Sequence, residues 1–113
     1  MYCIFCDITA GKIPSDIIYQ DEEVIAFRDI NPQSPVHLLI IPKKHLTSLV
    51  QLTEREKTLM GHMVTVANQL AKDEGIAESG YRLVINCGLQ GGQLVPHLHL
   101  HVLGGRQLSG QLG

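Results

Sequence analysis

The stretch Pro96-His97-Leu98-His99-Leu100-His101-Val102 places three of the chain's six histidines at alternate positions of one short segment. Side chains two positions apart in a β-strand point to the same face and lie ~6.5 Å apart. The alternation therefore predicts a half-buried strand over residues 97–103, with a row of imidazoles on one face and leucine and valine side chains on the other.

Other apolar and β-branched runs predict four further strands, at 17–20, 24–29, 36–42 and 81–86. The first two are separated by Asp21-Glu22-Glu23, which is typical of a hairpin. The third run is apolar enough to be a central strand. We therefore expect about five antiparallel strands.

Two segments carry helix signals. Residues 3–10 predict a short N-terminal helix, and Thr53 with Glu56 fits a capping box that begins a longer helix. Apolar residues then recur at helical spacing as far as Gly75. We expect a single α+β domain over residues 1–113, with a five-stranded antiparallel sheet, one main helix and a short N-terminal helix.

The composition limits the class of protein. Of the 113 residues, 44% are hydrophobic, which suffices for the core of one domain. The formal net charge of -2 argues against a nucleic-acid partner or an anionic membrane surface. Because no apolar run approaches the ~20 residues of a membrane span and residues 1–7 do not resemble a signal peptide, we expect a cytoplasmic protein.

Three interpretations of the histidine row follow from the residues alone. The row can be a solvated strand face, hold zinc through a His-x-His pair, or supply a nucleophile. Three alternate positions span ~13 Å, too far for all of them to bind one ion at ~2.1 Å, so we expect the row to divide its roles. Upstream, Gly91-Gly92 and Gln93 offer backbone and side-chain donors to an anion.

Residues 91–106, GGQLVPHLHLHVLGGR, resemble the signature of the histidine triad (HIT) family, in particular its nucleotide-binding phosphoramidase branch. Segments 13–14, 26–30, 36–43 and 80–82 fall where that branch has matching segments. The resemblance implies a hydrolase that cleaves purine nucleoside 5′-phosphoramidates. It also implies a homodimer in which two sheets join into a continuous one.

The resemblance assigns catalytic roles to four residues. It makes His99 the nucleophile that attacks the α-phosphate and is transiently nucleotidylated. It implies that His101 contacts the phosphate oxygens and that His37 orients this pair. Asn86 matches a position that touches the ester oxygen or the leaving group. Without the family, His37 would be interpreted as a satisfied core histidine.

The resemblance also implies a nucleotide site. Asp29 would accept both ribose hydroxyls, which suits a carboxylate because it only accepts hydrogen bonds. The purine would lie in an apolar slot built from Ile4, Phe5, Ile8, Phe27, Ile30 and Leu39. On the phosphate side it would be flanked by Gly92, Gln93 and Leu94, together with Asn86, His99 and His101. Without the family, the apolar residues would be interpreted as core and Asp29 as a turn residue.

The chain departs from the family pattern at Leu94, where related phosphoramidases usually carry serine or threonine. Leucine has no donor for the leaving nitrogen, so we expect protonation or positioning of the leaving group to differ and turnover to be slower. The tail over residues 107–113 lacks the tryptophan that some relatives present to substrate, so the preference for a leaving group stays open.

Cys3 and Cys6 have the Cys-x-x-Cys spacing of a zinc site or a redox dithiol. The odd count of three cysteines argues against a disulfide framework, and the absence of a preceding strand favours zinc over redox chemistry. The family resemblance implies His45 and His97 as the other two ligands. Such a four-ligand set is closed, so the zinc would be structural, and the route through His99 needs no catalytic cofactor.

Three alternatives to a phosphoramidase stay open. One is hydrolysis of dinucleoside polyphosphates, which relatives perform. Another is a nucleotide-binding or scaffold protein with weak or lost catalysis, which Leu94 keeps in view. The third is a catalytic zinc enzyme that uses three histidines.

Overall fold

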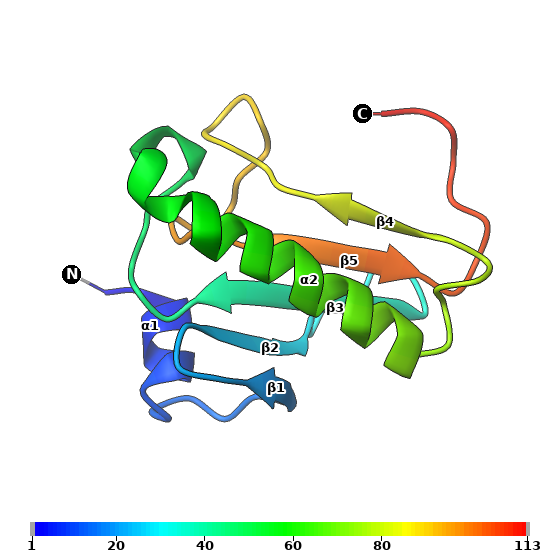
Figure 1. The fold of residues 1–113 in the computed structure, drawn as a ribbon, viewed down its shortest axis with the longest axis horizontal. Coiled ribbons are helices and arrows are strands. Elements are labelled where there is room, and N and C mark those ends of the chain that lie inside the picture. Colours follow the sequence, from blue (N-terminus) through cyan, green and yellow to red (C-terminus); the bar gives the residue numbers. More distant parts are fainter. Residues whose placement is uncertain (1, 113) are drawn as a thin grey trace.

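The sheet is the scaffold of the molecule. In the computed structural model, which describes residues 2–112, five antiparallel strands form one sheet in the order β1-β2-β3-β5-β4 (Figure 1). The strands are β1 (Ile17–Gln20), β2 (Val24–Arg28), β3 (Val36–Pro42), β4 (Tyr81–Val84) and β5 (Leu100–Gly104). The predicted hairpin and the central place of the third strand are confirmed.

The helix α2 (Lys57–Asp73) lies diagonally across one face of the sheet (Figure 1). Thr53 and Glu56 form the predicted capping box, which opens the short 3-10 turn η2 (Glu54–Glu56) and leads directly into α2. A second 3-10 turn, η1 (Leu49–Gln51), precedes it. The main core lies between helix and sheet and includes Met63, Ala67, Ala71, Val24, Leu38, Ile40, Leu100 and Val102.

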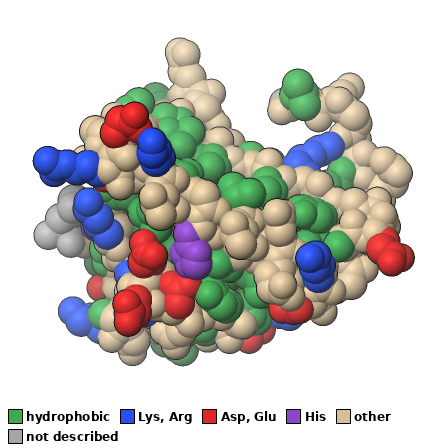
Figure 2. Space-filling model, viewed as in Figure 1, with side chains coloured by type: hydrophobic (Ala, Val, Ile, Leu, Met, Phe, Trp, Pro, Cys, Tyr) green, Lys and Arg blue, Asp and Glu red, His purple; other side chains and the backbone are tan. Residues whose placement is uncertain are grey.

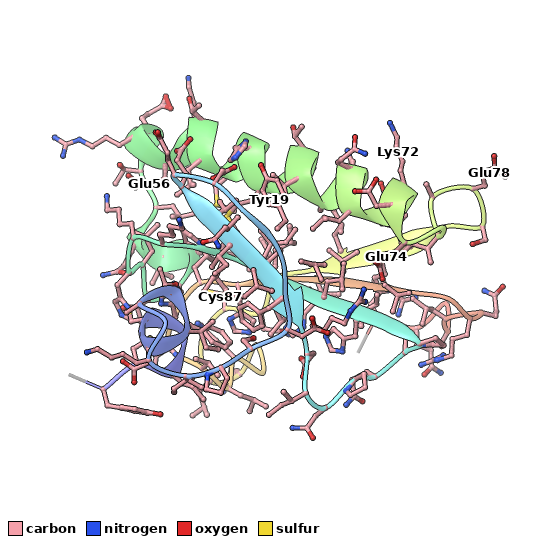
Figure 3. The ribbon with its side chains drawn as sticks, turned by 90° about the horizontal axis from the view of Figure 1, so that it is seen from below. Tyr19, Glu56, Lys72, Glu74, Glu78 and Cys87 are labelled. Carbon is pink, nitrogen blue, oxygen red and sulfur yellow. The ribbon has the colours of Figure 1, made fainter. Side chains whose placement is uncertain are left out.

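The short helix α1 (Ile4–Thr9) lies on the opposite face of the sheet from α2 (Figure 3). It packs Phe5 and Ile8 into a second apolar cluster with Ile25, Phe27, Leu39 and Ile41. A helix of six residues does not hold its shape in water unaided. The position of α1 therefore depends on its contacts with the sheet and on Cys3, whose sulfur caps it by accepting the Cys6 N–H at 3.4 Å.

The strand that carries the histidines is shorter than the sequence predicts. β5 begins at Leu100, because the N–H groups of His97 and Leu98 bind outside the sheet. His97 donates to the carbonyl of Val95 at 2.8 Å, and Leu98 donates to the carbonyl of Leu46 at 2.7 Å. The alternation is retained in that Leu100 and Val102 lie in the core beneath α2, but His97 and His99 are buried as well, so the segment is not half-buried as predicted.

The predicted strand over 81–86 is also shortened. β4 ends at Val84, whose partner across the ladder is His101. Because β5 begins at Leu100, the chain beyond Val84 has little strand left to pair with. Asn86 is thereby released into the loop that precedes the histidine row.

Two features of the structure bear on the partners that the composition argues against, a nucleic acid and a membrane. Acidic and basic side chains are interspersed on the face that carries α2 (Figure 2), as the small net charge leads one to expect. Over residues 2–112, neither helix has the length and apolar content to cross a bilayer.

Candidate functional site

A cavity of about 500 Å³ opens on the face of the sheet that carries α1. Its volume falls in the range of about 300–1,000 Å³ that is usual for small-molecule sites. Among the predicted site residues, those that line it are Ile4, Phe5, Ile8, Phe27, Asp29, Ile30, His37, Leu39, Asn86, Gly92, Leu94, His99 and His101. Residues from α1, three strands and two loops are thus brought together.

Strand pairing places the floor of the cavity. Phe27 on β2 is paired with Leu39 on β3, and Leu39 is paired with His101 on β5, so these three side chains form a row across the sheet. The ring of Phe5 on α1 packs edge to face against the rings of Phe27 and His99, with ring centroids 5.6 and 5.2 Å apart, respectively. The floor of the cavity is therefore apolar over β2 and β3 and is formed by a histidine ring at β5.

The tautomer of His99 is fixed by the backbone. Its Nδ1 lies 2.7 Å from the carbonyl oxygen of His97, and a carbonyl only accepts, so Nδ1 carries the proton. In the neutral ring, Nε2 then keeps its lone pair. His99 is only 6% exposed, and its ring lines the cavity. This arrangement is the one that a nucleophilic imidazole requires.

His37 and His101 are joined by a hydrogen bond, and both carry the proton on Nε2, whereas His99 carries it on Nδ1. The backbone N–H of Gln33 donates to Nδ1 of His37 at 3.0 Å, so the proton of this ring is on Nε2. From there it is donated to Nδ1 of His101 at 2.9 Å. Nδ1 of His101 is thus an acceptor, and its own proton is on Nε2. His101 can therefore donate a hydrogen bond where His99 offers a lone pair.

Burial keeps these two rings neutral. It lowers the pKa of His37, against the opposing charge of Asp29. Burial, followed by the neighbouring His99 and His37, lowers the pKa of His101 to about 4. The donor and acceptor roles deduced for the neutral rings consequently hold at neutral pH.

Asp29 closes this group of polar residues at the end of β2. One carboxylate oxygen accepts the N–H of Asn31 at 2.8 Å, and the other lies 3.3 Å from Nε2 of His37. The side chain is 18% exposed, so part of it faces the cavity. Its oxygens retain lone pairs that can accept hydroxyl groups of a ligand.

The loop before the histidines is built around its glycines. A Cβ at Gly91 would lie 2.2 Å from the carbonyl oxygen of Cys87, so no other residue fits there, and Gly92 has a φ of 80°. The side-chain amide of Asn86 donates to the carbonyl of Gly91 at 2.8 Å. This bond uses one of the two hydrogens on the Asn86 nitrogen and orients the amide, whose oxygen is available to accept a hydrogen bond from a ligand.

Two expected anion donors are used inside this loop instead. Gln93 does not line the cavity; its amide donates to the carbonyls of Thr47 and Val95 and accepts the N–H of Gly88. The N–H of Gly92 is donated to the carbonyl of Leu89 at 3.1 Å. In this structure the N–H of Gly92 and the side-chain amide of Gln93 are thus engaged within the protein, while Gly92 itself lines the cavity.

A second cluster lies behind the cavity and contains Cys3, Cys6, His45 and His97, with one ligand atom from each within 4.8 Å of the others. Nδ1 of His97 lies 3.4 Å from the Cys3 sulfur, 3.6 Å from the Cys6 sulfur and 3.1 Å from Nδ1 of His45. A tetrahedral zinc site with bonds of about 2.0–2.3 Å has donor-to-donor separations of about 3.3–3.8 Å. The four residues fit such an ion.

The orientation of His97 suits this use. Its Nε2 lies 2.8 Å from the carbonyl oxygen of Pro42 and donates to it, so the lone pair is on Nδ1 and faces the two sulfurs. Burial is the main cause that lowers the pKa of His97, which keeps the ring neutral and able to bind a cation. The row of histidines thus divides, with His97 turned away from His99 and His101.

Two contributors to the site were missed from the sequence. Gln33 acts through its backbone N–H, for which a sequence has no signal beyond the turn-rich composition of its loop. Leu46 accepts the N–H of Leu98 and so brings the neighbouring His45 beside His97. From the residues alone nothing indicates that His45 and His97 are adjacent; the family resemblance implies it, and the fold shows it.

The class of this protein is defined by an α+β scaffold that places the buried imidazole of His99 at the floor of a largely apolar cavity. Residues 10–108 match the model of the HIT domain, and the chain belongs to this family. The purine nucleoside phosphoramidase of Escherichia coli (strain K12) is 50% identical over 109 residues, which cover 96% of this chain and 92% of that relative.

Two further similarities agree with this assignment. A 14 kDa zinc-binding protein of Zea mays is 52% identical over 108 residues, covering 94% of this chain and 84% of that protein. The crystal structure of a HIT family hydrolase from Legionella pneumophila Philadelphia 1 superposes with a TM-score of 0.97 at 46% identity, covering 99% of this chain and all of the other. The predicted family and the predicted fold class are both confirmed.

The low pKa of His101 predicts a pH dependence of stability. The unfolded chain takes up a proton on this residue near pH 6.5, whereas the folded chain does so only near pH 4. The free energy of unfolding should therefore fall between pH 7 and 5, with a contribution from His101 on the order of 1 kcal/mol. Urea unfolding of the wild type and of His101→Asn at both pH values measures it. Equal pH dependence in the two proteins would contradict the prediction.

Proposed function

We propose that this chain hydrolyses purine nucleoside 5′-phosphoramidates through a nucleotidyl intermediate on His99. The observation that carries the proposal is the unprotonated Nε2 of His99 in the cavity, enforced by the bond from Nδ1 to the carbonyl of His97. The identity to a purine nucleoside phosphoramidase over nearly the whole chain supports the same reaction class.

The reaction would proceed in two displacements. Nε2 of His99 bonds to the α-phosphorus, the P–N bond breaks, and the amine departs with a proton from solvent. Since Nδ1 keeps its proton, the nucleotidyl imidazole is cationic and a good leaving group. Water then attacks phosphorus, the P–Nε2 bond breaks, and the nucleoside monophosphate leaves as a water proton passes to solvent.

The neighbouring residues would serve this route. The Nε2–H of His101 would donate to a phosphoryl oxygen on which charge develops, and His37 would hold that tautomer. Asp29 would accept the ribose hydroxyls, and the purine would lie among the apolar side chains of α1, β2 and β3. The free amide oxygen of Asn86 would accept an N–H of the leaving amine.

Replacement of the nucleophile tests the proposal. His99→Ala should lower kcat for adenosine 5′-phosphoramidate by at least about 10³-fold and leave the Kd for adenosine monophosphate within a few-fold, because the base and ribose contacts stay. His62→Ala, which removes a histidine of α2 that is bound to Asp21 in the turn between β1 and β2, is the matched control and should retain turnover. An active His99→Ala protein would refute the role of His99.

We propose further that Cys3, Cys6, His45 and His97 hold one structural zinc ion. When bound, the metal would supply a cross-link between α1, the segment after β3 and the histidine row. The four protein donors leave no open position for substrate, so no step of the reaction passes through this site. The name of the similar zinc-binding protein of Zea mays supports the choice of metal.

Elemental analysis tests the metal site. Protein purified without chelator should contain about one zinc ion per chain, and Cys6→Ser should lose most of it. Cys87→Ser is the control, because Cys87 is a free cysteine outside the cluster and its loss should not change the zinc content. A wild-type protein without zinc, or equal zinc in the two variants, would overturn the assignment.

We also propose that two copies join through β4. In the described sheet β4 is an edge strand, so one side of its backbone is free to pair with a second copy and extend the sheet. Sedimentation velocity should then give twice the chain mass of 12.5 kDa. Leu83→Pro, which removes a backbone donor from this strand, should shift the protein toward the monomer. A monomeric wild type at micromolar concentration would contradict this part.

A further inference from the structure

The order of the strands gives the cavity two ends. Phe5, Phe27 and Leu39 lie on the α1 side of the histidines, whereas Asn86, Gly92 and Leu94 belong to the loop between β4 and β5 on the other side. We refer to these last three residues as the exit wall. With the purine at the α1 end and phosphorus at His99, an in-line displacement directs the departing group toward the exit wall.

Leu94 is the conspicuous member of the exit wall. It lines the cavity, yet it is 92% exposed, so the protein itself covers almost none of this large apolar side chain. An apolar group that lay against it would be removed from water together with it, and the gain is proportional to the apolar area that both lose. A polar group of the same shape would gain much less.

The charged residues around the cavity also favour an uncharged leaving group. Among its lining residues in the part of the chain described, those that carry a full charge are Arg28 and Asp29. The guanidinium of Arg28 is held by both carboxylate oxygens of Glu74, at 2.7 and 3.0 Å, and lies 3.5 Å from a carboxylate oxygen of Asp16. No lining cation is thus left to meet a negatively charged leaving group, such as a further phosphate.

We infer that the exit wall selects phosphoramidates whose leaving amine carries an uncharged apolar substituent, and that Leu94 is the residue that determines this specificity. The inference rests on the proposed function and narrows its substrate class. It disfavours dinucleoside polyphosphates, whose leaving group is a nucleotide with several negative charges. The bond changes are those given above: P–N breaks, and the amine leaves with a proton from solvent.

Two isosteric substrates test the inference. One is the adenosine 5′-phosphoramidate of heptylamine, and the other is that of 2-(2-methoxyethoxy)ethylamine, in which two methylene groups are replaced by oxygen. The measured quantity is the ratio of their kcat/KM values. The two amines differ in intrinsic reactivity, but this difference cancels when the ratio is compared between protein variants.

The variants are Leu94→Asn and its control Leu89→Asn. Both substitutions keep the approximate shape of the side chain and make it polar, and both leucines are over 90% exposed, so neither change disturbs the core. Leu89 belongs to the same loop but does not line the cavity. The heptylamine preference should fall about tenfold in Leu94→Asn and stay at the wild-type value in Leu89→Asn.

The outcomes separate the two levels of the proposal. If the wild type cleaves both substrates and the ratio is the same in Leu94→Asn, the inference is wrong and the proposed function stands. The same holds if Leu89→Asn lowers the ratio equally, because the effect would then not belong to the exit wall. If the wild type cleaves neither substrate nor unsubstituted adenosine 5′-phosphoramidate, the proposed function fails and the inference fails with it.

Discussion

The hydrogen bond from Nδ1 of His99 to the carbonyl of His97 is the contact on which the site depends. It decides which nitrogen of His99 bears the lone pair, and it requires that the backbone at His97 be held in place. The side chain of His97 supplies that restraint, since it is fully buried between the carbonyl of Pro42 and the sulfurs of Cys3 and Cys6. The candidate metal cluster and the candidate nucleophile thus share one residue.

His99 and His101, two of the three histidines that line the cavity, have opposite tautomers for different reasons. His99 is oriented by a carbonyl of its own segment, whereas His101 is oriented by His37 on β3, which in turn is oriented by the backbone of Gln33. Their ring centres lie 5.0 Å apart. A lone pair and a donor are therefore placed side by side through backbone groups and the neutral ring of His37.

Much of the fold and part of the candidate site were predictable from the sequence, because they depend on local residue patterns. The alternation of histidine with leucine, the capping box at Thr53 and the apolar run of β3 each have a signal in the order of residues. The start of β5 and the use of Gln93 inside its loop were not predictable, because both depend on acceptors that are distant in sequence. The N–H of Leu98 donates to the carbonyl of Leu46, and the side-chain amide of Gln93 donates to the carbonyl of Thr47. The resemblance to a family, rather than spacing, brought His45 together with Cys3 and Cys6.

The alternation along residues 97–102 also limits which insertions and deletions this segment can tolerate. Leu100 and Val102 face the core beneath α2 and Leu98 is fully buried, whereas His99 and His101 line the cavity on the other face. Insertion or loss of a single residue here would exchange the two faces, sending imidazoles into the core and leucines into the site. Length variation in this segment would therefore abolish folding and chemistry in one event, whereas the exposed loop before it, around Leu89, can vary without that cost.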